Sequence, residues 1–226
     1  MIFLDCLNDS EFKQKALNKL SENYQLDFKN DFEYKDNQFG INPFYINLGP
    51  LEIFNSSLND KFNLNAPTTK NNLIRILRAM QLDKSILMEG NPGVGKTSLI
   101  SALSAITGHN LVRINLSDQT DIMDLFGSDL PCESGSGTFK WKDGPFLRAL
   151  KDGHWILLDE LNLASQSVLE GLNACLDHRG TVYIPELNKE FKVSKNCRIF
   201  AAQNPSCQGG GRKGLPKSFL NRFTQV

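Results

Sequence analysis

The stretch Gly90-Asn91-Pro92-Gly93-Val94-Gly95-Lys96-Thr97-Ser98 decides the fold of this chain. It contains the pattern G-x-x-x-x-G-K-[ST], whose glycines let the backbone turn so that successive N–H groups point at phosphate oxygens. The apolar run 85–89 before it predicts a strand, and the periodic run 97–107 after it predicts a helix whose N-terminus attracts anions. The stretch therefore predicts a phosphate-binding loop, with Lys96 on the β- and γ-phosphates and the Thr97 hydroxyl on Mg²⁺. A glycine-rich turn without a ligand is the alternative.

Two acidic residues follow a second apolar strand. The run 155–158 is fully apolar, which is typical of an interior strand of a parallel sheet, and Asp159 and Glu160 come directly after it. Burying carboxylates is costly unless a cation or hydrogen bonds compensate them. We therefore expect Asp159 to hold Mg²⁺ and Glu160 to orient or deprotonate an attacking water. Alone, the strand could also end in a simple edge turn; together with the loop it predicts a nucleotide hydrolase.

Two further polar residues fit a hydrolytic site. Asn204 follows the predicted strand 198–202 and could reach between Glu160 and the γ-phosphate, although an Asn before Pro is also common in turns. Arg222 ends a predicted short helix and could stabilise the transition-state charge on a phosphate bound to a neighbour. Its alternative is a solvated surface arginine. The residues alone leave both alternatives open.

Strands and helices alternate from residue 66 onward. The predicted strands are 85–89, 111–116, 155–158 and 198–202, and the predicted helices are a segment capped by Thr68 or Thr69 that carries Leu73, Leu77 and Met80, a segment 97–107 stopped by Gly108, and a segment 167–177 opened by a Ser167-x-x-Glu170 capping box. Such alternation predicts an α/β fold of three layers, a parallel sheet with helices on both faces.

Two segments interrupt this alternation. Residues 128–144 contain Gly135 and Gly137 and then the alternating run Phe139-Lys140-Trp141-Lys142. Residues 181–193 read as two short alternating runs on either side of a polar turn. Both segments predict β-hairpins inserted into the α/β core.

Residues 1–65 differ from the rest in composition, being rich in Asn, Asp, Lys and Phe. Helical periodicity is confined to about residues 10–22, and the segment 40–50 is extended and rich in turn signals. We therefore divide the chain into residues 1–65, a linker or the tail of a preceding unit, and residues 66–226, a nucleotide-binding unit.

The charges of the chain cancel in total but not locally. The 226 residues contain 25 Lys plus Arg and 25 Asp plus Glu, which argues against a general binder of nucleic acids or anionic membranes. Residues 1–65 hold 10 acids and 6 bases, residues 66–190 hold 15 acids and 12 bases, and residues 191–226 hold 7 bases and no acid. The basic C-terminal stretch therefore needs an explanation.

The apolar runs and the cysteines indicate the cellular compartment of the protein. No apolar run approaches the roughly 20 residues of a membrane span, and Asp5 interrupts the start too early for a signal peptide. The five cysteines are scattered and never spaced as C-x-x-C. This favours reduced thiols in a cytosolic or nuclear protein over disulfides or a zinc site.

The arrangement resembles the AAA+ ATPases, which order a Walker A loop, a Walker B strand ending in D-E, an Asn after the next strand and an Arg on the following helix. The two predicted hairpins are similar to the helix-2 insert and the pre-sensor-1 hairpin of the clade that includes the MoxR-type and MCM-type ATPases. The residues within these motifs are more specifically similar to the giant dynein-related AAA+ proteins of large-ribosomal-subunit assembly. This similarity covers residues 66–226 and 37–46, and is densest at 90–99, 113–117, 124–131, 158–166, 203–205 and 209–219.

The resemblance implies a single module of an AAA+ ring with ATP sites at the interfaces between modules. It gives Lys96, Thr97, Asp159, Glu160 and Asn204 roles in the module's own site, with ATP and Mg²⁺ as cofactors, and makes Arg222 an arginine finger for the next module. It further implies neighbouring AAA+ modules as partners and, through the full-length protein, the pre-60S particle and its assembly factors in the nucleolus and nucleoplasm. No direct nucleic-acid or membrane contact is expected.

The resemblance also sets what this chain is expected to lack. The D-x-S-x-S pattern of the adhesion domain that grips assembly factors is absent. The sequence stops at Val226 on the expected last core strand, so the helical lid and its sensor-2 residue are expected to be missing. We therefore expect the isolated chain to hydrolyse ATP poorly.

Two other functions stay open at this point. The chain could be a catalytically silent structural module, although both acids and the loop lysine are intact. It could also bind nucleic acid through its basic stretch, although the lysines and arginines there lack interleaved aromatics. The stretch, with Arg212 and Lys213, is better explained as the face that meets the phosphates of a neighbouring module.

Overall fold

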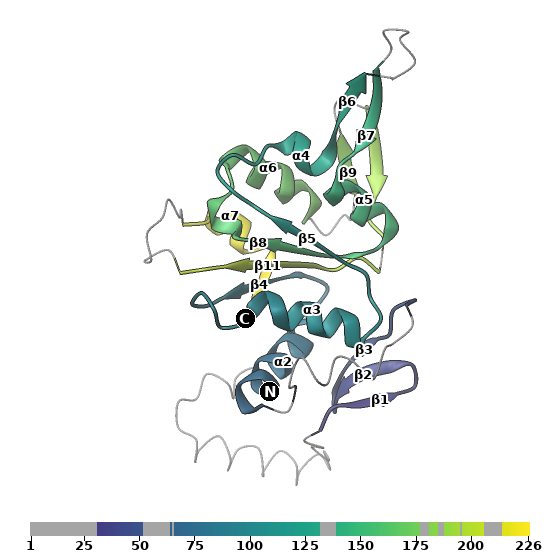
Figure 1. The fold of residues 1–226 in the computed structure, drawn as a ribbon, viewed down its shortest axis with the longest axis vertical. Coiled ribbons are helices and arrows are strands. Elements are labelled where there is room, and N and C mark those ends of the chain that lie inside the picture. Colours follow the sequence, from purple (N-terminus) through teal and green to yellow (C-terminus); the bar gives the residue numbers. More distant parts are fainter. Residues whose placement is uncertain are drawn as a thin grey trace.

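The fold is built on a five-stranded parallel sheet with strand order β12-β4-β11-β8-β5 (Figure 1). The computed structural model describes residues 31–51, 64, 66–131, 139–176, 181–184, 188–194, 196–205 and 214–226. The strands are β4 (Ser85–Glu89), β5 (Leu111–Asn115), β8 (Trp155–Asp159), β11 (Ile199–Gln203) and β12 (Phe223–Gln225). The predicted helix 10–22 and the loop 209–213 lie outside the described residues.

Helices cover both faces of this sheet (Figure 1). The helices are α2 (Pro67–Ala79), α3 (Lys96–Ile106), α4 (Ile122–Phe126), α5 (Pro145–Asp152), α6 (Gln166–Cys175) and α7 (Lys217–Leu220). Helices α2 and α3 pack on one face, and α4, α5 and α6 on the other. The predicted three-layer α/β fold is confirmed. None of the helices in the described part of the chain is long and apolar enough to cross a bilayer.

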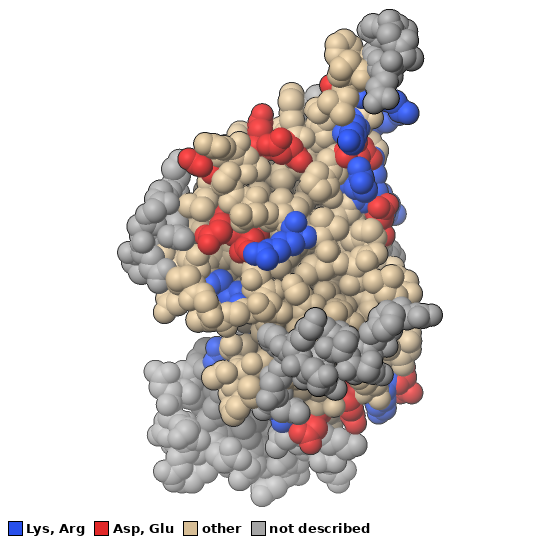
Figure 2. Space-filling view, in the orientation of Figure 1, with Lys and Arg blue, Asp and Glu red and all other residues tan. Residues whose placement is uncertain are grey.

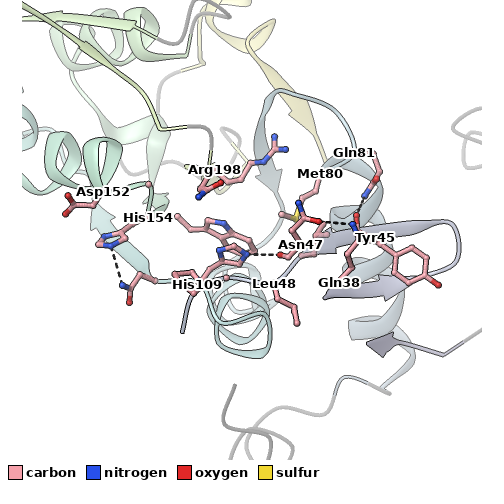
Figure 3. A pocket seen from close by; sticks show the side chains of 17 residues that line it. Gln38, Tyr45, Asn47, Leu48, Met80, Gln81, His109, Asp152, His154 and Arg198 are labelled. Atoms are coloured by element: carbon pink, nitrogen blue, oxygen red, sulfur yellow. Dashed lines mark hydrogen bonds between the residues drawn. The ribbon is translucent and has the colours of Figure 1, made fainter. Parts of the chain in front are cut away.

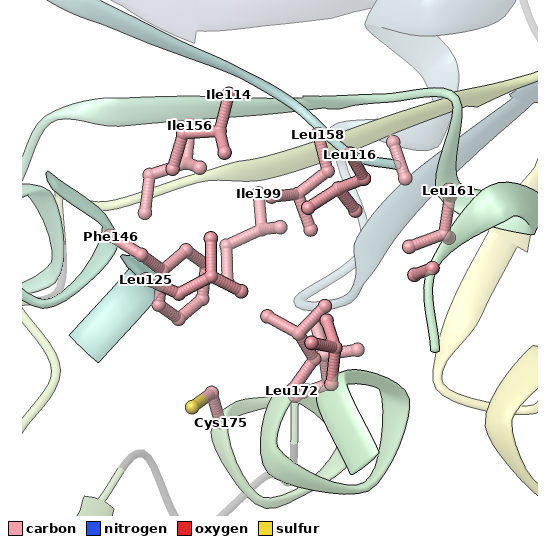
Figure 4. Packing of buried hydrophobic residues seen from close by; sticks show 14 of the residues in the cluster. Ile114, Leu116, Leu125, Phe146, Ile156, Leu158, Leu161, Leu172, Cys175 and Ile199 are labelled. Atoms are coloured by element: carbon pink, nitrogen blue, oxygen red, sulfur yellow. The ribbon is translucent and has the colours of Figure 1, made fainter. Parts of the chain in front are cut away.

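Of the three interior strands, β4, β11 and β8, the last two are the most completely buried. Their first four residues are all buried, and each strand pairs in parallel with a neighbour on either side. On the face of α4, α5 and α6, Phe146 packs with Leu125, Ile156 and Ile199 (Figure 4). Cys175 lies in the same cluster, where burial raises the pKa of its thiol to about 12. It is therefore a protonated, apolar side chain at neutral pH.

Both predicted hairpins are confirmed. Strands β6 (Gly127–Pro131) and β7 (Phe139–Asp143) form an antiparallel pair that projects from the molecule, and β9 (Thr181–Ile184) pairs with β10 (Lys189–Lys192). Basic side chains gather along the β6–β7 arm on the face shown in Figure 2. A single lysine of α5, Lys151, joins the bases of the two hairpins. Its Nζ lies 2.6 Å from Oδ2 of Asp143 and 4.0 Å from the centre of the Phe191 ring.

A small antiparallel sheet occupies part of the region expected to be a linker or tail. It consists of β1 (Glu33–Lys35), β2 (Gln38–Ile41) and β3 (Phe44–Asn47). Three of its side chains, Phe39, Ile41 and Ile46, are buried in the same core as α2 and α3. The short strands have too few residues for a periodic signal, which is why the sequence indicated only extended structure. The division at residue 65 stays a prediction, but residues 39–46 share the core of the larger unit.

A polar hollow of about 650 Å³ separates this small sheet from the starts of the parallel strands (Figure 3). At its floor, the His109 ring stacks on Trp155 with ring centres 4.2 Å apart, and its Nε2 lies 3.0 Å from the carbonyl oxygen of Asn47. Burial lowers the pKa of His109, and the Asn47 contact acts in the opposite direction. His109 therefore serves as a neutral bridge between the two sheets.

Two predicted helix starts were wrong. Helix α2 begins at Pro67 after Ala66, without a side-chain cap from a threonine, because the fixed φ of proline suits the first turn of a helix. Helix α6 begins at Gln166, and its N-cap is Ser165, two residues before the predicted cap Ser167. The Ser165 Oγ accepts a hydrogen bond from the Val168 N–H. In both cases the cap residue lies nearer the preceding loop than the apolar pattern suggested.

Truncation of the central phenylalanine should destabilise the fold. Phe146 has an exposed fraction of 0%, whereas Phe139, at the start of β7, is 70% exposed. We expect Phe146→Ala to lower the free energy of unfolding by about 3–5 kcal/mol, because it leaves a cavity, and Phe139→Ala to change it by less than about 0.5 kcal/mol. Urea denaturation of the two variants measures this difference, and equal effects would contradict the described packing.

Candidate active site

The loop between β4 and α3 forms an open cradle. Gly93 and Gly95 have φ angles of +81° and +84°, in the left-handed region that glycine adopts without strain, and a Cβ at either position would meet nothing within 4 Å. Gly95 is also the N-cap of α3, and it has no side chain that could accept hydrogen bonds from the first N–H groups of the helix. The first N–H groups of α3 therefore face the cradle without a side-chain acceptor, which suits a bound anion.

Lys96 lies folded into this cradle. Its Nζ donates to the carbonyl oxygens of Gly90 at 2.7 Å and Asn91 at 3.0 Å, and to Oδ1 of Asn204 at 2.9 Å. Burial lowers the pKa of Lys96, while the nearby carboxylates of Glu160 and Asp159 act in the opposite direction. The ammonium group is thus held at the position where phosphate oxygens would compete for it.

The two acids at the end of β8 lie beside the cradle. Asp159 Oδ2 accepts a hydrogen bond from NH2 of Arg113 at 2.6 Å, and its Oδ1 accepts from the Glu160 N–H at 3.1 Å. Glu160 has a φ of +54°, which turns the chain sharply after the strand. This turn directs the Glu160 carboxylate to the neighbouring strand, where Asn204 Nδ2 donates to it at 2.7 Å.

Asn204 links the loop lysine to the second acid. Its side-chain Oδ1 accepts a hydrogen bond from the Lys96 ammonium, and its Nδ2 donates one to the Glu160 carboxylate. The amide thus turns its acceptor to the cation and its donor to the anion. Asn204 is buried, and its backbone carbonyl oxygen accepts a hydrogen bond from Nδ2 of Asn162 at 2.8 Å. The structure therefore brings together Lys96, Asp159, Glu160 and Asn204, as the sequence predicted.

Arg222 lies far from this site in its own chain. It precedes Phe223, which pairs with Ser85 at the start of β4, whereas Gly90 follows the opposite end of that strand. Arg222 is therefore level with residue 84, six residues before Gly90 along β4. At about 3.3 Å per residue, Arg222 and Gly90 are separated by roughly 20 Å along the sheet. The structure thus does not bring Arg222 to the loop of the same chain, and any contact of this residue with a phosphate would involve another molecule or module.

The comparisons with known proteins agree with this geometry. Residues 85–223 match the family model of the AAA domain, dynein-related subfamily. This chain belongs to that subfamily. The match covers the cradle, both acids, Asn204 and Arg222, so the whole candidate site lies inside the AAA domain.

Two curated relatives are similar to most of the chain. A midasin of Dictyostelium discoideum is 64% identical over 193 residues, and a midasin of Giardia intestinalis is 58% identical over 165 residues. These matches cover 85% and 73% of this chain but only 3% of each relative, so the chain corresponds to a single AAA module within them. A solved structure of a candidate ATPase from Cytophaga hutchinsonii is also similar, with a TM-score of 0.55 and 26% identity over 70% of this chain and 46% of that one.

The side chains of this AAA domain fit a magnesium ion bound together with a nucleotide. Thr97 lies in the first turn of α3 and Asp159 ends β8, so both offer the hard oxygen ligands that Mg²⁺ prefers. Within the described part of the chain, no three His, Cys, Asp or Glu side chains gather as a metal site of their own. Phosphate oxygens and water would have to supply the other ligands.

Part of this AAA site carries no signal in the sequence. A cavity of about 110 Å³ lies beside the cradle, between Val94 and the α2 residues Asn72, Arg75 and Ile76. It adjoins the cradle at Gly95, where the base or sugar of a nucleotide could lie. Arg113 and Asn162 were also not predicted as site residues, because a lone Arg on a strand and a lone Asn in a turn carry no spacing signal.

Removal of the cradle lysine should weaken nucleotide binding. We expect Lys96→Met to lower the affinity of the chain for ADP by about tenfold to a hundredfold, because charge-assisted hydrogen bonds to phosphate are lost. Lys142→Met on the β6–β7 arm is the matched control and should leave the affinity unchanged. Isothermal titration calorimetry measures both, and an unaltered affinity of the Lys96 variant would argue against phosphate binding in the cradle.

Proposed function

We propose that this chain is an ATP-binding and ATP-hydrolysing motor module of a midasin-like protein. The observation that carries the proposal is the hydrogen-bonded chain from Lys96 through Asn204 to Glu160, beside the open glycine cradle. It connects the group that would hold the phosphates to the group that would activate water. Membership of a family of ATPases supports the same activity.

The residues divide the work of hydrolysis between them. With ATP in the cradle, Lys96 would exchange its bonds to the Gly90 and Asn91 carbonyls for bonds to phosphate oxygens. Glu160 would orient the attacking water and accept its proton, and Asn204 would hold Glu160 at the γ-phosphate. When bound between Thr97 and Asp159, Mg²⁺ would neutralise phosphate charge.

The catalytic site would be complete only in a ring of modules. Arg222 is too far from its own cradle but could reach a phosphate of the next module, where its charge would stabilise the transition state. The basic stretch 191–226 would then face the phosphates of a neighbour. Neighbouring AAA modules are therefore the first partners of this chain, and the isolated chain should turn over slowly.

The wider role follows from the likeness to midasins. We propose that the full-length protein uses this module to remodel pre-60S ribosomal particles and release assembly factors in the nucleus. The high identity to the two midasins supports this role. A module that binds nucleotide without hydrolysing it is the outcome that the following experiment distinguishes.

Substitution of the proposed base tests hydrolysis at this site. In the assembled ring, we expect Glu160→Gln to slow hydrolysis at this module by about 10² to 10⁴-fold, because the general base is lost, while ATP stays bound. ATPase assays and cryo-EM density at this site, with Glu170→Gln on the surface of α6 as the control, measure the effect. Unchanged turnover and unchanged nucleotide content would support a silent structural module instead.

Substitution of Arg222 tests the trans-acting role. We expect Arg222→Ala to lower turnover by the assembled ring by about 10³-fold at the neighbouring site, yet to leave the ADP affinity of the isolated chain unchanged. Calorimetry on the isolated chain and ATPase assays on the ring give the two values. A loss of affinity in the isolated chain would show that Arg222 acts in its own module.

A further inference from the structure

Arg113 occupies the side of the site where a metal ion would bind. It lies on β5, the edge strand of the parallel sheet, and its NH2 group contacts Oδ2 of Asp159 at 2.6 Å. The Arg113 side chain is 58% exposed, whereas that of Asp159 is only 14% exposed. One partner of the pair is therefore fixed, and the other is a long side chain that can move into solvent.

The strand pairing explains why this contact forms. In the register between β5 and β8, Asn115 lies opposite Asp159 and Arg113 lies opposite Leu157. Because alternate residues of a strand point to the same face, Arg113 starts from the face of Asp159 and reaches along the sheet toward its end.

The charges at the site balance without any ligand. Among the described residues, the acids Asp159 and Glu160 have two cationic neighbours. Arg113 contacts Asp159 directly, and Lys96 lies close enough that both carboxylates oppose the lowering of its pKa by burial. A divalent cation at Asp159 would add two positive charges close to the Arg113 guanidinium. The guanidinium and the metal would then compete for the same carboxylate oxygen.

We propose that Arg113 is a built-in counter-ion that stands at Asp159 while the metal is absent and is displaced when the metal enters with the nucleotide. This inference rests on the proposed nucleotide site and deepens it. Arg113 thereby keeps two carboxylates from repelling phosphates in the metal-free site, and it lowers the affinity for the metal. The residue sets how strongly nucleotide binding depends on metal.

The consequence is a specific coupling between the two ligands. Without Arg113, no other side chain in the described part of the chain forms an ion pair with Asp159. Metal-free ADP therefore meets more negative charge and binds more weakly. The metal, in contrast, meets one positive charge fewer and binds more tightly. Removal of Arg113 should therefore widen the ratio between ADP affinities measured with and without metal, a change that a purely structural ion pair would not produce.

The experiment compares three substitutions in the 226-residue chain. Calorimetry gives the ADP affinity in EDTA and in Mg²⁺, and electron paramagnetic resonance gives the affinity of the ADP complex for Mn²⁺ as the metal probe. We expect Arg113→Met to tighten Mn²⁺ binding about tenfold and to weaken ADP binding in EDTA severalfold, because a neighbouring charge commonly shifts such equilibria by this amount. Arg113→Lys, which keeps the charge, should stay within about threefold of the wild type.

Arg198→Met is the matched control. Arg198 also forms an exposed ion pair, with Asp83 at 3.2 Å, but at the opposite ends of the strands, and its loss should change neither affinity. Unchanged or weaker Mn²⁺ binding by the Arg113→Met variant, with an unchanged thermal unfolding midpoint, would overturn the inference while leaving the nucleotide site intact. Failure of the wild-type chain to bind ADP with or without metal would overturn the proposed function as well.

Discussion

The parallel pairing of β4, β11 and β8 is the constraint on which the site depends. The pairing places Ala201 opposite both Leu87 and Leu158, so the three strands end at the same edge of the sheet. The residues that leave this edge are the glycine cradle, Asn204 and the two acids. None of these polar groups could approach the others without the apolar interior of β8 and β11, because burial on both faces fixes their positions in the sheet. The core is thus the device that aligns the chemistry.

Much of this arrangement could be predicted because several signals coincide in short segments. The cradle, the apolar strand before Asp159 and the spacing to Asn204 are local patterns, and the topology of parallel sheets then brings them together. The helices α4 and α5 were not predicted, since α4 has only one turn and α5 is signalled chiefly by Pro145 at its start and Gly153 at its end. The small sheet β1–β3 and the partners of Asp159 depend on contacts distant in sequence, which no local pattern encodes.

In its ligand-free form the site pairs its charged side chains with one another, whereas the first N–H groups of α3 have no side-chain acceptor. Lys96 bonds to backbone carbonyls and Asn204, Asn204 bonds to Glu160, and Arg113 bonds to Asp159. A ligand must therefore exchange these side-chain contacts for its own. Such exchange reduces the net gain from each new hydrogen bond, but it keeps the carboxylates and the lysine in place before binding. The same contacts therefore pre-organise the site and reduce the net gain from binding.

The contact of Lys151 with both hairpins has a mechanical meaning. Asp143 ends the β6–β7 arm, Phe191 belongs to β10, and Lys151 sits on α5, the helix that leads directly into β8. Because one side chain contacts both projections, α5 is a support that the two hairpins share. That support continues into the strand that carries Asp159 and Glu160. The two hairpins therefore share one attachment point on α5, next to the strand of the two acids.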